Sequence, residues 1–263
     1  MIRSRKRPSA RLPRTRPGGT KRRVWFFDLD DTLHDASHAM FGAIDTRMTD
    51  FVRRHLQIDH AAADALRQSY WKRYGATLLG LVRHHGVNPQ RFLRETHDFD
   101  VTSLLRVERG LRQLGRPLAG RKVLLTNAPD HYAGRVLRGI GLHRHIRTRY
   151  AVESMRVHGH IRPKPSVSML RAMLVREGLG GRHSPARAIL VDDNVRNLKA
   201  ARSVGFATVL LQRKGGEAPR RLTSAAFVTG RIASVRQLPA LAARMGWLGK
   251  SAVGALAACG ERR

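Results

Sequence analysis

Three carboxylates within four positions are the strongest chemical feature of this sequence. Asp28, Asp30 and Asp31 directly follow the apolar run 24–27, which has the length and composition of a buried strand. Like charges gathered this closely raise one another's pKa unless a cation neutralises them. Carboxylate oxygens at the end of a strand are hard ligands that suit Mg²⁺. The segment therefore predicts an acidic site that binds magnesium.

Polar residues follow two further apolar runs in the same way. Thr126 and Asn127 end one of them, and a hydroxyl and backbone N–H groups at such a turn can hold phosphate oxygens. Asp192 and Asp193 end the other and add two more carboxylates. Between these segments, Lys164 stands between two prolines that stiffen its loop and can aim its charge at one point.

These segments alternate with helical patterns, which predicts an α/β fold. A parallel sheet with helices on both faces accounts for the alternation. Ligands of such sheets bind beyond the carboxyl ends of the strands, so the acidic and polar residues are expected to meet there. The expected strands are 24–27, 122–125, 188–191 and 207–211, and a helix is expected at 195–204.

The ordered set of motifs resembles the haloacid dehalogenase-like superfamily. The motifs are Asp28-x-Asp30-x-Thr32, then Thr126, then Lys164, then Asp192-Asp193. The resemblance covers about residues 24–245 and implies a three-layer, Rossmann-like catalytic core with an inserted all-helical cap of the C1 type. The implied parts are a core at 24–34 and 119–245, a cap at 35–118, and a tail at 246–263. The expected cap helices are 39–56, 61–74 and 89–96.

The resemblance implies a Mg²⁺-dependent phosphomonoester hydrolase that forms an aspartyl-phosphate. Asp28 is the expected nucleophile, and Asp30 the expected acid and base that also ligates the metal through its backbone carbonyl. The expected phosphate-binding residues are Thr126, Asn127 and Lys164. The expected metal ligands are Asp28, Asp30, Asp192 and Asp193, and the sequence leaves open which of the last two is closer to the metal.

The cap segment resembles the pyrimidine 5′-nucleotidase branch of the superfamily. The resemblance lies in residues 70–81, in His84-His85 and in the stretch from Phe92 to His97. It implies UMP-like or CMP-like substrates. The candidate substrate contacts in the cap are Tyr74, Thr77, His84 and His97, whereas Trp71 is expected to pack inside the cap.

Other functions remain open at this stage, because a fold does not fix a substrate. One alternative is a phosphatase for another small phosphoester, such as phosphoglycolate or a sugar phosphate, or a phosphomutase. An alternative of another class is a polyanion-binding protein on the same scaffold.

The charge of the chain indicates which classes of binding partner it favours. The chain has 50 Lys and Arg against 19 Asp and Glu, a formal net charge of +31, which attracts anionic substrates and nucleic acid. Ten of these cations lie in residues 1–23, a segment without acids that we expect to be a disordered arm able to contact nucleic acid non-specifically.

No apolar run reaches the roughly 20 residues of a membrane span. The lone Cys259 suggests a reducing, cytoplasmic location.

Overall fold

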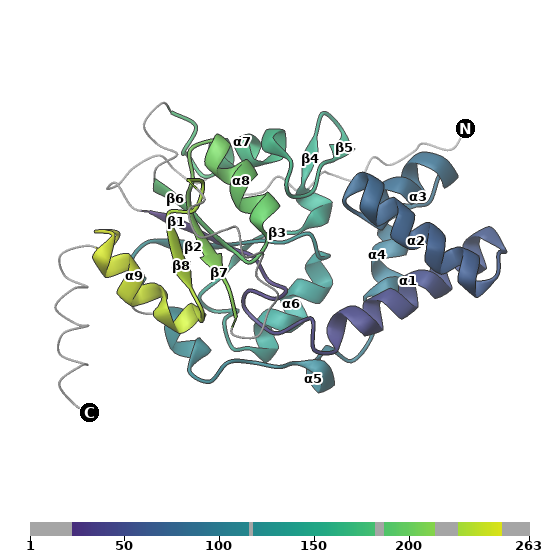
Figure 1. Cartoon of the computed structure of the whole chain (residues 1–263), viewed down its shortest axis with the longest axis horizontal. Coiled ribbons are helices and arrows are strands. Elements are labelled where there is room, and N and C mark those ends of the chain that lie inside the picture. The colour runs from purple at the N-terminus through teal and green to yellow at the C-terminus, as the bar shows by residue number, and fades with distance from the viewer. Residues whose placement is uncertain (1–22, 116–117, 182–186, 214–225, 249–263) are drawn as a thin grey trace, which may run out of the picture.

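The computed structural model describes residues 23–115, 118–181, 187–213 and 226–248. Most of the basic arm and of the C-terminal tail therefore lies outside the described residues. Within them, six parallel strands form the central sheet in the order β3-β2-β1-β6-β7-β8 (Figure 1). The strands are β1 (Val24–Phe27), β2 (Arg121–Leu125), β3 (Thr148–Tyr150), β6 (Ala188–Asp192), β7 (Ala207–Leu211) and β8 (Gly230–Ile232).

Strand β1 lies at the centre of the sheet and is buried on both faces. Trp25 and Phe27 point into one hydrophobic cluster, and Val24 and Phe26 point into another. Because successive side chains of a strand alternate between faces, a continuous apolar run is what a strand covered on both sides requires. The same reasoning explains the fully buried strands β6 and β7.

Helices cover both faces and complete three layers. The cluster around Trp25 includes residues of α5 (Val101–Leu104), α6 (Asp130–Gly139) and α9 (Leu238–Arg244). The cluster around Phe26 includes residues of α7 (Val167–Arg176) and α8 (Val195–Ser203). The expected fold class, a three-layer α/β sheet with inserted helices, is confirmed.

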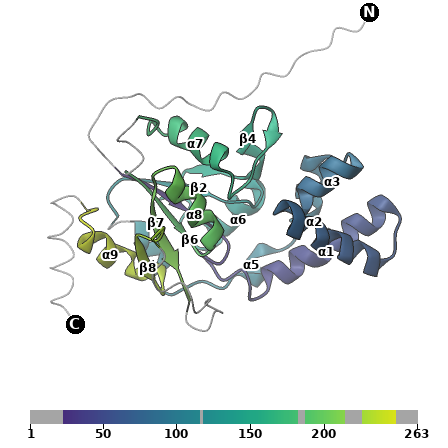
Figure 2. The same ribbon diagram turned by 45° about the horizontal axis from the view of Figure 1, so that its top comes forward.

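Four helices between β1 and β2 form what we call the helical insertion, and Figures 1 and 2 show it to one side of the sheet. Its helices pack on a hydrophobic cluster of their own, which includes Phe51, Leu81 and Phe92. Local signals fix the helix ends, because Asp59 caps one N-terminus and Gly75 ends the same helix in the left-handed conformation. The helices are α1 (Met40–Leu56), α2 (His60–Tyr74), α3 (Thr77–His85) and α4 (Pro89–Thr96).

Short elements connect these parts. A two-stranded antiparallel hairpin, β4 (Arg156–Val157) and β5 (His160–Ile161), stands apart from the main sheet. The 3-10 helices are η1 (Leu111–Gly115), η2 (Val152–Ser154) and η4 (Val235–Gln237). In the described part of the chain, no helix has the length and apolar character needed to cross a membrane.

The C-terminal part of the core extends beyond the boundary expected at residue 245. Trp247 is 7% exposed, and its ring meets that of Trp25 edge-on at 5.8 Å. Leu248 belongs to the same buried cluster. Trp247 and Leu248, assigned to the tail from sequence, therefore pack in the core, while the domain boundaries themselves remain a prediction.

The close approach of α2 and α3 yields a test of the packing. A Cβ on Gly80 would overlap the ring of Tyr70, whereas a Cβ on the exposed Gly42 of α1 would meet nothing within 4 Å. Gly80→Ala should therefore lower the free energy of unfolding by about 1–3 kcal/mol. Gly42→Ala, the matched control, should raise it by up to about 1 kcal/mol, because alanine favours helix. Urea denaturation measures both, and equal stabilities would show that α2 and α3 are not in tight contact.

Candidate active site

The residues expected to do chemistry meet at the carboxyl ends of three neighbouring strands. Asp28 follows β1, Thr126 follows β2, and Asp192 ends β6. Since β1 pairs with β2 on one side and β6 on the other, these residues are brought to one edge of the sheet. Lys164 reaches the same point from the loop that precedes α7. The structure thus places four distant segments of the chain in one site.

Lys164 forms the centre of this site. Its side chain is buried, and its Nζ lies 2.7 Å from Oδ1 of Asp28 and 2.9 Å from Oδ2 of Asp192. Burial alone would lower the pKa of Lys164, but the two carboxylates outweigh it and raise the pKa above its usual value. The ammonium is therefore permanently charged and tied to two strands at once.

Asn127 fixes the loop that carries Lys164. Its side-chain Nδ2 donates to the Lys164 carbonyl oxygen at 3.0 Å, and the Lys164 backbone N–H donates to Asn127 Oδ1 at 2.8 Å. This reciprocal pair joins the end of β2 to the lysine loop. The sequence analysis assigned Asn127 only a backbone N–H for phosphate, so the positioning role of its side chain is an addition.

The carboxylates outnumber the single ammonium, and this excess suits a cation. Oxygen atoms of Asp28, Asp192 and Asp193 lie within 4.8 Å of one another. Burial raises the pKa of Asp28 well above its usual range, and the neighbouring carboxylates raise it further against the opposing effect of Lys164. Burial, together with the charge of Asp192, also raises the pKa of Asp193 to about 6. A divalent cation would relieve this repulsion, and three converging carboxylates are a fitting donor set for Mg²⁺.

The two adjacent aspartates differ in how their oxygens are occupied. Asp192 is wholly buried and accepts from Lys164, from Asn197 Nδ2, which donates to both of its oxygens, and from a backbone N–H at the start of α8. Asp193 is partly buried, and its side-chain bond from the Thr32 hydroxyl, 2.9 Å long, uses Oδ1. Asp193 thus keeps an oxygen for a cation, which favours it over Asp192 as the closer ligand.

Asp30 lies on the wall of the adjoining cavity, and its side chain is 17% exposed. Its Oδ1 accepts a hydrogen bond of 2.9 Å from the hydroxyl of Tyr132 and lies 2.9 Å from Nε2 of His34. Both partners are fully buried. Sequence reasoning missed them: the spacing of four between Asp30 and His34 was a usable signal, but Tyr132 is 102 positions away and gave none.

The cavity has a volume of about 700 Å³ and lies between the strand ends and the helical insertion. Of the four substrate contacts expected in the insertion, Thr77 and His97 line it, whereas Tyr74 and His84 are not among its lining residues. Tyr74 and His84 instead bond to each other, with 2.5 Å between the Tyr74 hydroxyl and Nε2 of His84. Their expected contact with substrate therefore gains no support.

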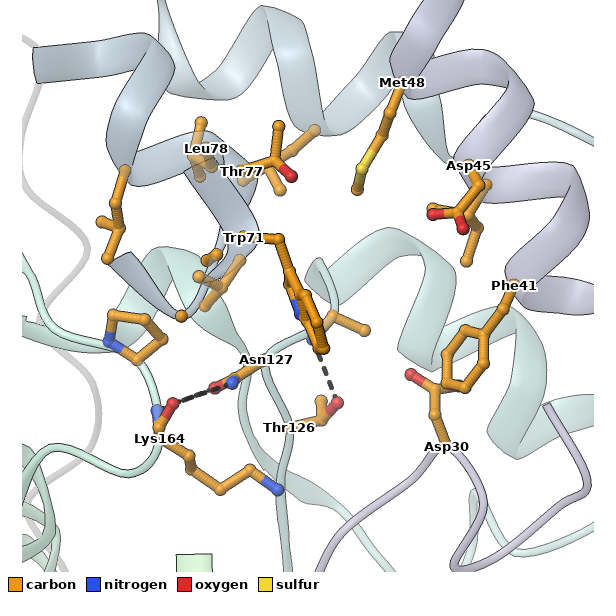
Figure 3. Close-up of a pocket in the computed structure, with 18 of the residues that line it drawn as sticks. Asp30, Phe41, Asp45, Met48, Trp71, Thr77, Leu78, Thr126, Asn127 and Lys164 are labelled. Carbon is orange, nitrogen blue, oxygen red and sulfur yellow. Dashed lines mark hydrogen bonds between the residues drawn. The ribbon is translucent and has the colours of Figure 1, made fainter. Parts of the chain in front are cut away.

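Trp71 corrects an expectation made from sequence. It does not pack inside the insertion, because its side chain is 61% exposed and lines the cavity. Figure 3 shows its ring extending from α2 toward the end of the cavity that holds Thr126 and Asn127, with Phe41 beside Asp30. An exposed indole on a cavity wall offers a flat apolar surface to a ligand.

More than half of this chain matches the model of a known protein family. The model for haloacid dehalogenase-like hydrolases matches residues 23–205. The chain belongs to this family. Phosphate metabolism protein 8 of Saccharomyces cerevisiae is 24% identical over 201 residues, which are 72% of this chain and 61% of the yeast protein. The chain thus aligns with less than two thirds of that relative's length.

Solved structures of haloacid dehalogenase-like proteins share the fold. An HAD phosphatase from Thermococcus onnurineus is 18% identical with a TM-score of 0.53, covering 83% of this chain and 97% of that one. The L-2-haloacid dehalogenase of Xanthobacter autotrophicus, with chloropropionic acid covalently bound, is also 18% identical, with a TM-score of 0.52 and coverages of 85% and 99%. At these identities the likeness establishes the fold and leaves the reaction to the site itself.

The buried His97 predicts a pH dependence of stability. Burial lowers its pKa to about 4, against an opposing effect of Asp30. An unfolded histidine has a pKa of about 6.5, so between these values the unfolded chain binds more protons than the folded chain. The contribution of His97 is therefore full above about pH 6.5 and is lost as the pH falls toward 4. Urea denaturation at pH 7.5 and 4.5 should show about 2–3 kcal/mol more loss for the parent than for His97→Gln. Equal losses would mean that His97 is hydrated in the fold.

Proposed function

We propose that this protein is a Mg²⁺-dependent phosphomonoesterase that acts through an aspartyl-phosphate on Asp28, with a nucleoside 5′-monophosphate of the pyrimidine type as substrate. The observation that carries the proposal is the pairing of the Asp28 carboxylate with the buried ammonium of Lys164, next to a second carboxyl, Asp30, on the cavity wall. The first group is suited to attack phosphorus, and the second is suited to handle the proton of the leaving group.

The phosphate end of the substrate would be held by groups already fixed in place. Lys164 and the hydroxyl of Thr126, together with the Asn127 N–H, supply positive charge and donors where the equatorial oxygens gather charge in the transition state. Asp28, Asp193 and the Asp30 carbonyl would hold Mg²⁺, which when bound offsets the repulsion between an anionic phosphoryl group and a carboxylate. Without such compensation, a carboxylate is a poor nucleophile toward phosphate.

The reaction has two balanced steps. Asp28 forms a bond to phosphorus while the ester P–O bond breaks, and Asp30 gives its proton to the leaving oxygen. Asp30 then takes a proton from water as that water attacks phosphorus, and the bond between Asp28 and phosphorus breaks. Asp28 and Asp30 return to their starting states, and inorganic phosphate leaves.

The position of Asp30 favours phosphate esters over halogenated acids as substrates. Halogenated acids come into question because one of the solved structures with this fold is an L-2-haloacid dehalogenase. A halide leaves without a proton, so dehalogenation gains nothing from a carboxyl on the cavity wall. An alkoxide is a poor leaving group at neutral pH and needs a proton donor. The acidic cluster of Asp28, Asp192 and Asp193 also suits a cation that binds phosphate.

Trp71 supports a substrate with a flat ring. The cavity falls within the range of pockets that bind molecules larger than phosphate itself. The exposed Trp71 ring provides a stacking surface, and stacked bases gain about 1–3 kcal/mol from such contacts. Phosphoglycolate and sugar phosphates lack a ring of this kind. A purely polyanion-binding role would leave the buried Lys164 pair and its carboxylates without a purpose.

The nucleophile is tested by removing its charge. Asp28→Asn keeps the shape of the side chain and should lower turnover of every phosphomonoester by at least about a thousandfold. Asp98→Asn makes the same change on a carboxyl that is 77% exposed and should retain parental turnover. Release of phosphate, measured with Mg²⁺ and after chelation, supplies the readout for UMP, CMP, AMP, phosphoglycolate and p-nitrophenyl phosphate. Activity of Asp28→Asn within tenfold of the parent contradicts the mechanism. Chloride release from 2-chloropropionate without phosphatase activity would assign the dehalogenase reaction instead.

Base recognition is tested at Trp71. Trp71→Ala should lower the ratio of kcat/KM for UMP to that for a small alkyl phosphate by about tenfold, because only the nucleotide loses a stacking partner. Trp71→Phe should keep most of the ratio. Tyr74→Ala, three positions along the same helix but off the cavity, is the matched control and should leave the ratio unchanged. An effect of Tyr74→Ala without one of Trp71→Ala would reverse the assignment, and a parent that does not favour UMP or CMP would refute the nucleotide proposal.

A further inference from the structure

The carboxyl group of Asp30 is held asymmetrically. Both of its buried partners, Tyr132 and His34, approach the same oxygen, Oδ1, at 2.9 Å each. They come from different elements, since Tyr132 belongs to α6 and His34 to the loop after β1. An oxygen that accepts two hydrogen bonds has no lone pair well placed for a proton of its own.

His34 is fixed as a donor by its surroundings. The turn formed by residues 31–33 folds the chain back, so that the His34 N–H reaches the Leu29 carbonyl and the ring comes to lie against Asp30. Nε2 faces a carboxylate oxygen, which can only accept, so Nε2 carries the hydrogen. Nδ1 is buried and has no hydrogen-bond partner among the described residues. A buried lone pair without a partner destabilises the fold less than a buried N–H without one, so a ring with its hydrogen on Nε2 fits this position.

Tyr132 is a donor for the same geometric reason. Its hydroxyl can give its hydrogen to Oδ1 of Asp30, and its ring is fully buried among His97, Phe99 and the residues of its own helix. Burial, with the charge of Asp30, raises the pKa of Tyr132, so that the hydroxyl keeps its hydrogen. Two fixed donors therefore converge on one oxygen of a residue that lines the cavity.

We propose that His34 and Tyr132 are positioning residues that reserve Oδ1 of Asp30 for their own hydrogen bonds and leave Oδ2, which neither of them contacts, as the oxygen that exchanges a proton with the leaving group. The inference rests on the proposed phosphomonoesterase function. In the first step the ester P–O bond breaks, the bond from Asp28 to phosphorus forms, and the proton on Oδ2 moves to the leaving oxygen. Neither His34 nor Tyr132 touches the substrate; they keep the Asp30 carboxyl from rotating.

The test uses two esters that differ in their need for a proton. p-Nitrophenyl phosphate releases a stable phenolate, whereas p-nitrobenzyl phosphate, of similar shape, releases an alkoxide that must be protonated. The quantity compared is kcat/KM in the presence of Mg²⁺, because it includes only steps up to the first irreversible one. The later attack of water, in which Asp30 acts as the base, therefore does not enter.

Removing either donor should affect one ester selectively. Tyr132→Phe and His34→Leu should each lower kcat/KM for the benzyl ester by about ten- to a hundredfold, the scale of a lost hydrogen bond to a charged group, and change it less than about threefold for the phenyl ester. His34→Gln, which can again present an N–H near the Nε2 position, should restore most of the loss. Tyr150→Phe is the matched control, because it removes a hydroxyl bonded to a carboxylate, Glu177, away from Asp30.

The outcomes separate this inference from the proposed function. Equal losses on both esters, or no loss on either, in a parent that cleaves both would overturn the positioning roles while leaving the phosphatase in place. A parent that cleaves neither ester with Mg²⁺ present would refute the proposed function, and the inference with it. Should His34→Leu fail to fold, as judged by circular dichroism, Tyr132→Phe decides the question alone, because it removes a single hydroxyl.

Discussion

The structure of the site depends on one buried ammonium. Lys164 lies between carboxyl groups that end two neighbouring strands, β1 and β6, and its Nζ is within hydrogen-bond distance of both. A buried charge that loses its partner is strongly destabilising. The fold therefore needs the loop of Lys164, both strand ends and the two hydrogen bonds between Asn127 and Lys164 to be in place together. Order at the strand ends is therefore a condition of the fold as well as of the chemistry.

The need to hold Lys164 also gives the two adjacent aspartates different hydrogen-bond partners. The oxygens of Asp192 accept hydrogen bonds from Lys164, from Asn197 and from the start of α8, so Asp192 anchors the lysine. Asp193, next in sequence, is bonded to Thr32 on one side and remains available on the other. Two identical residues in succession thus receive different roles from their neighbours alone. In the same way, the neighbours of Asp30 make its two oxygens different, because both hydrogen bonds go to Oδ1.

The sequence predicted the core of the site because three apolar runs end in polar residues, and parallel strands bring such ends together. It could not place the wall of the cavity. Trp71 and Tyr74 lie three positions apart on α2, and which of them faces the cavity depends on how Tyr70 packs on Gly80 of α3, a helix that the sequence analysis did not predict. The hydrogen bond from Tyr132 to Asp30 could not be predicted for a related reason, since no local sequence pattern indicates a contact between residues 102 positions apart. Strands β3 and β8, of three residues each, are too short to show a period.

The distribution of tryptophans gives the protein a built-in optical reporter. Of the three in the chain, Trp25 and Trp247 lie edge to face inside the core, whereas Trp71 stands largely in solvent on the cavity wall. An indole in water emits at longer wavelength than one in an apolar interior. The red edge of the intrinsic fluorescence therefore follows what enters the cavity, and the blue edge follows the integrity of the sheet, so that occupancy and unfolding can be read separately in one unlabelled sample.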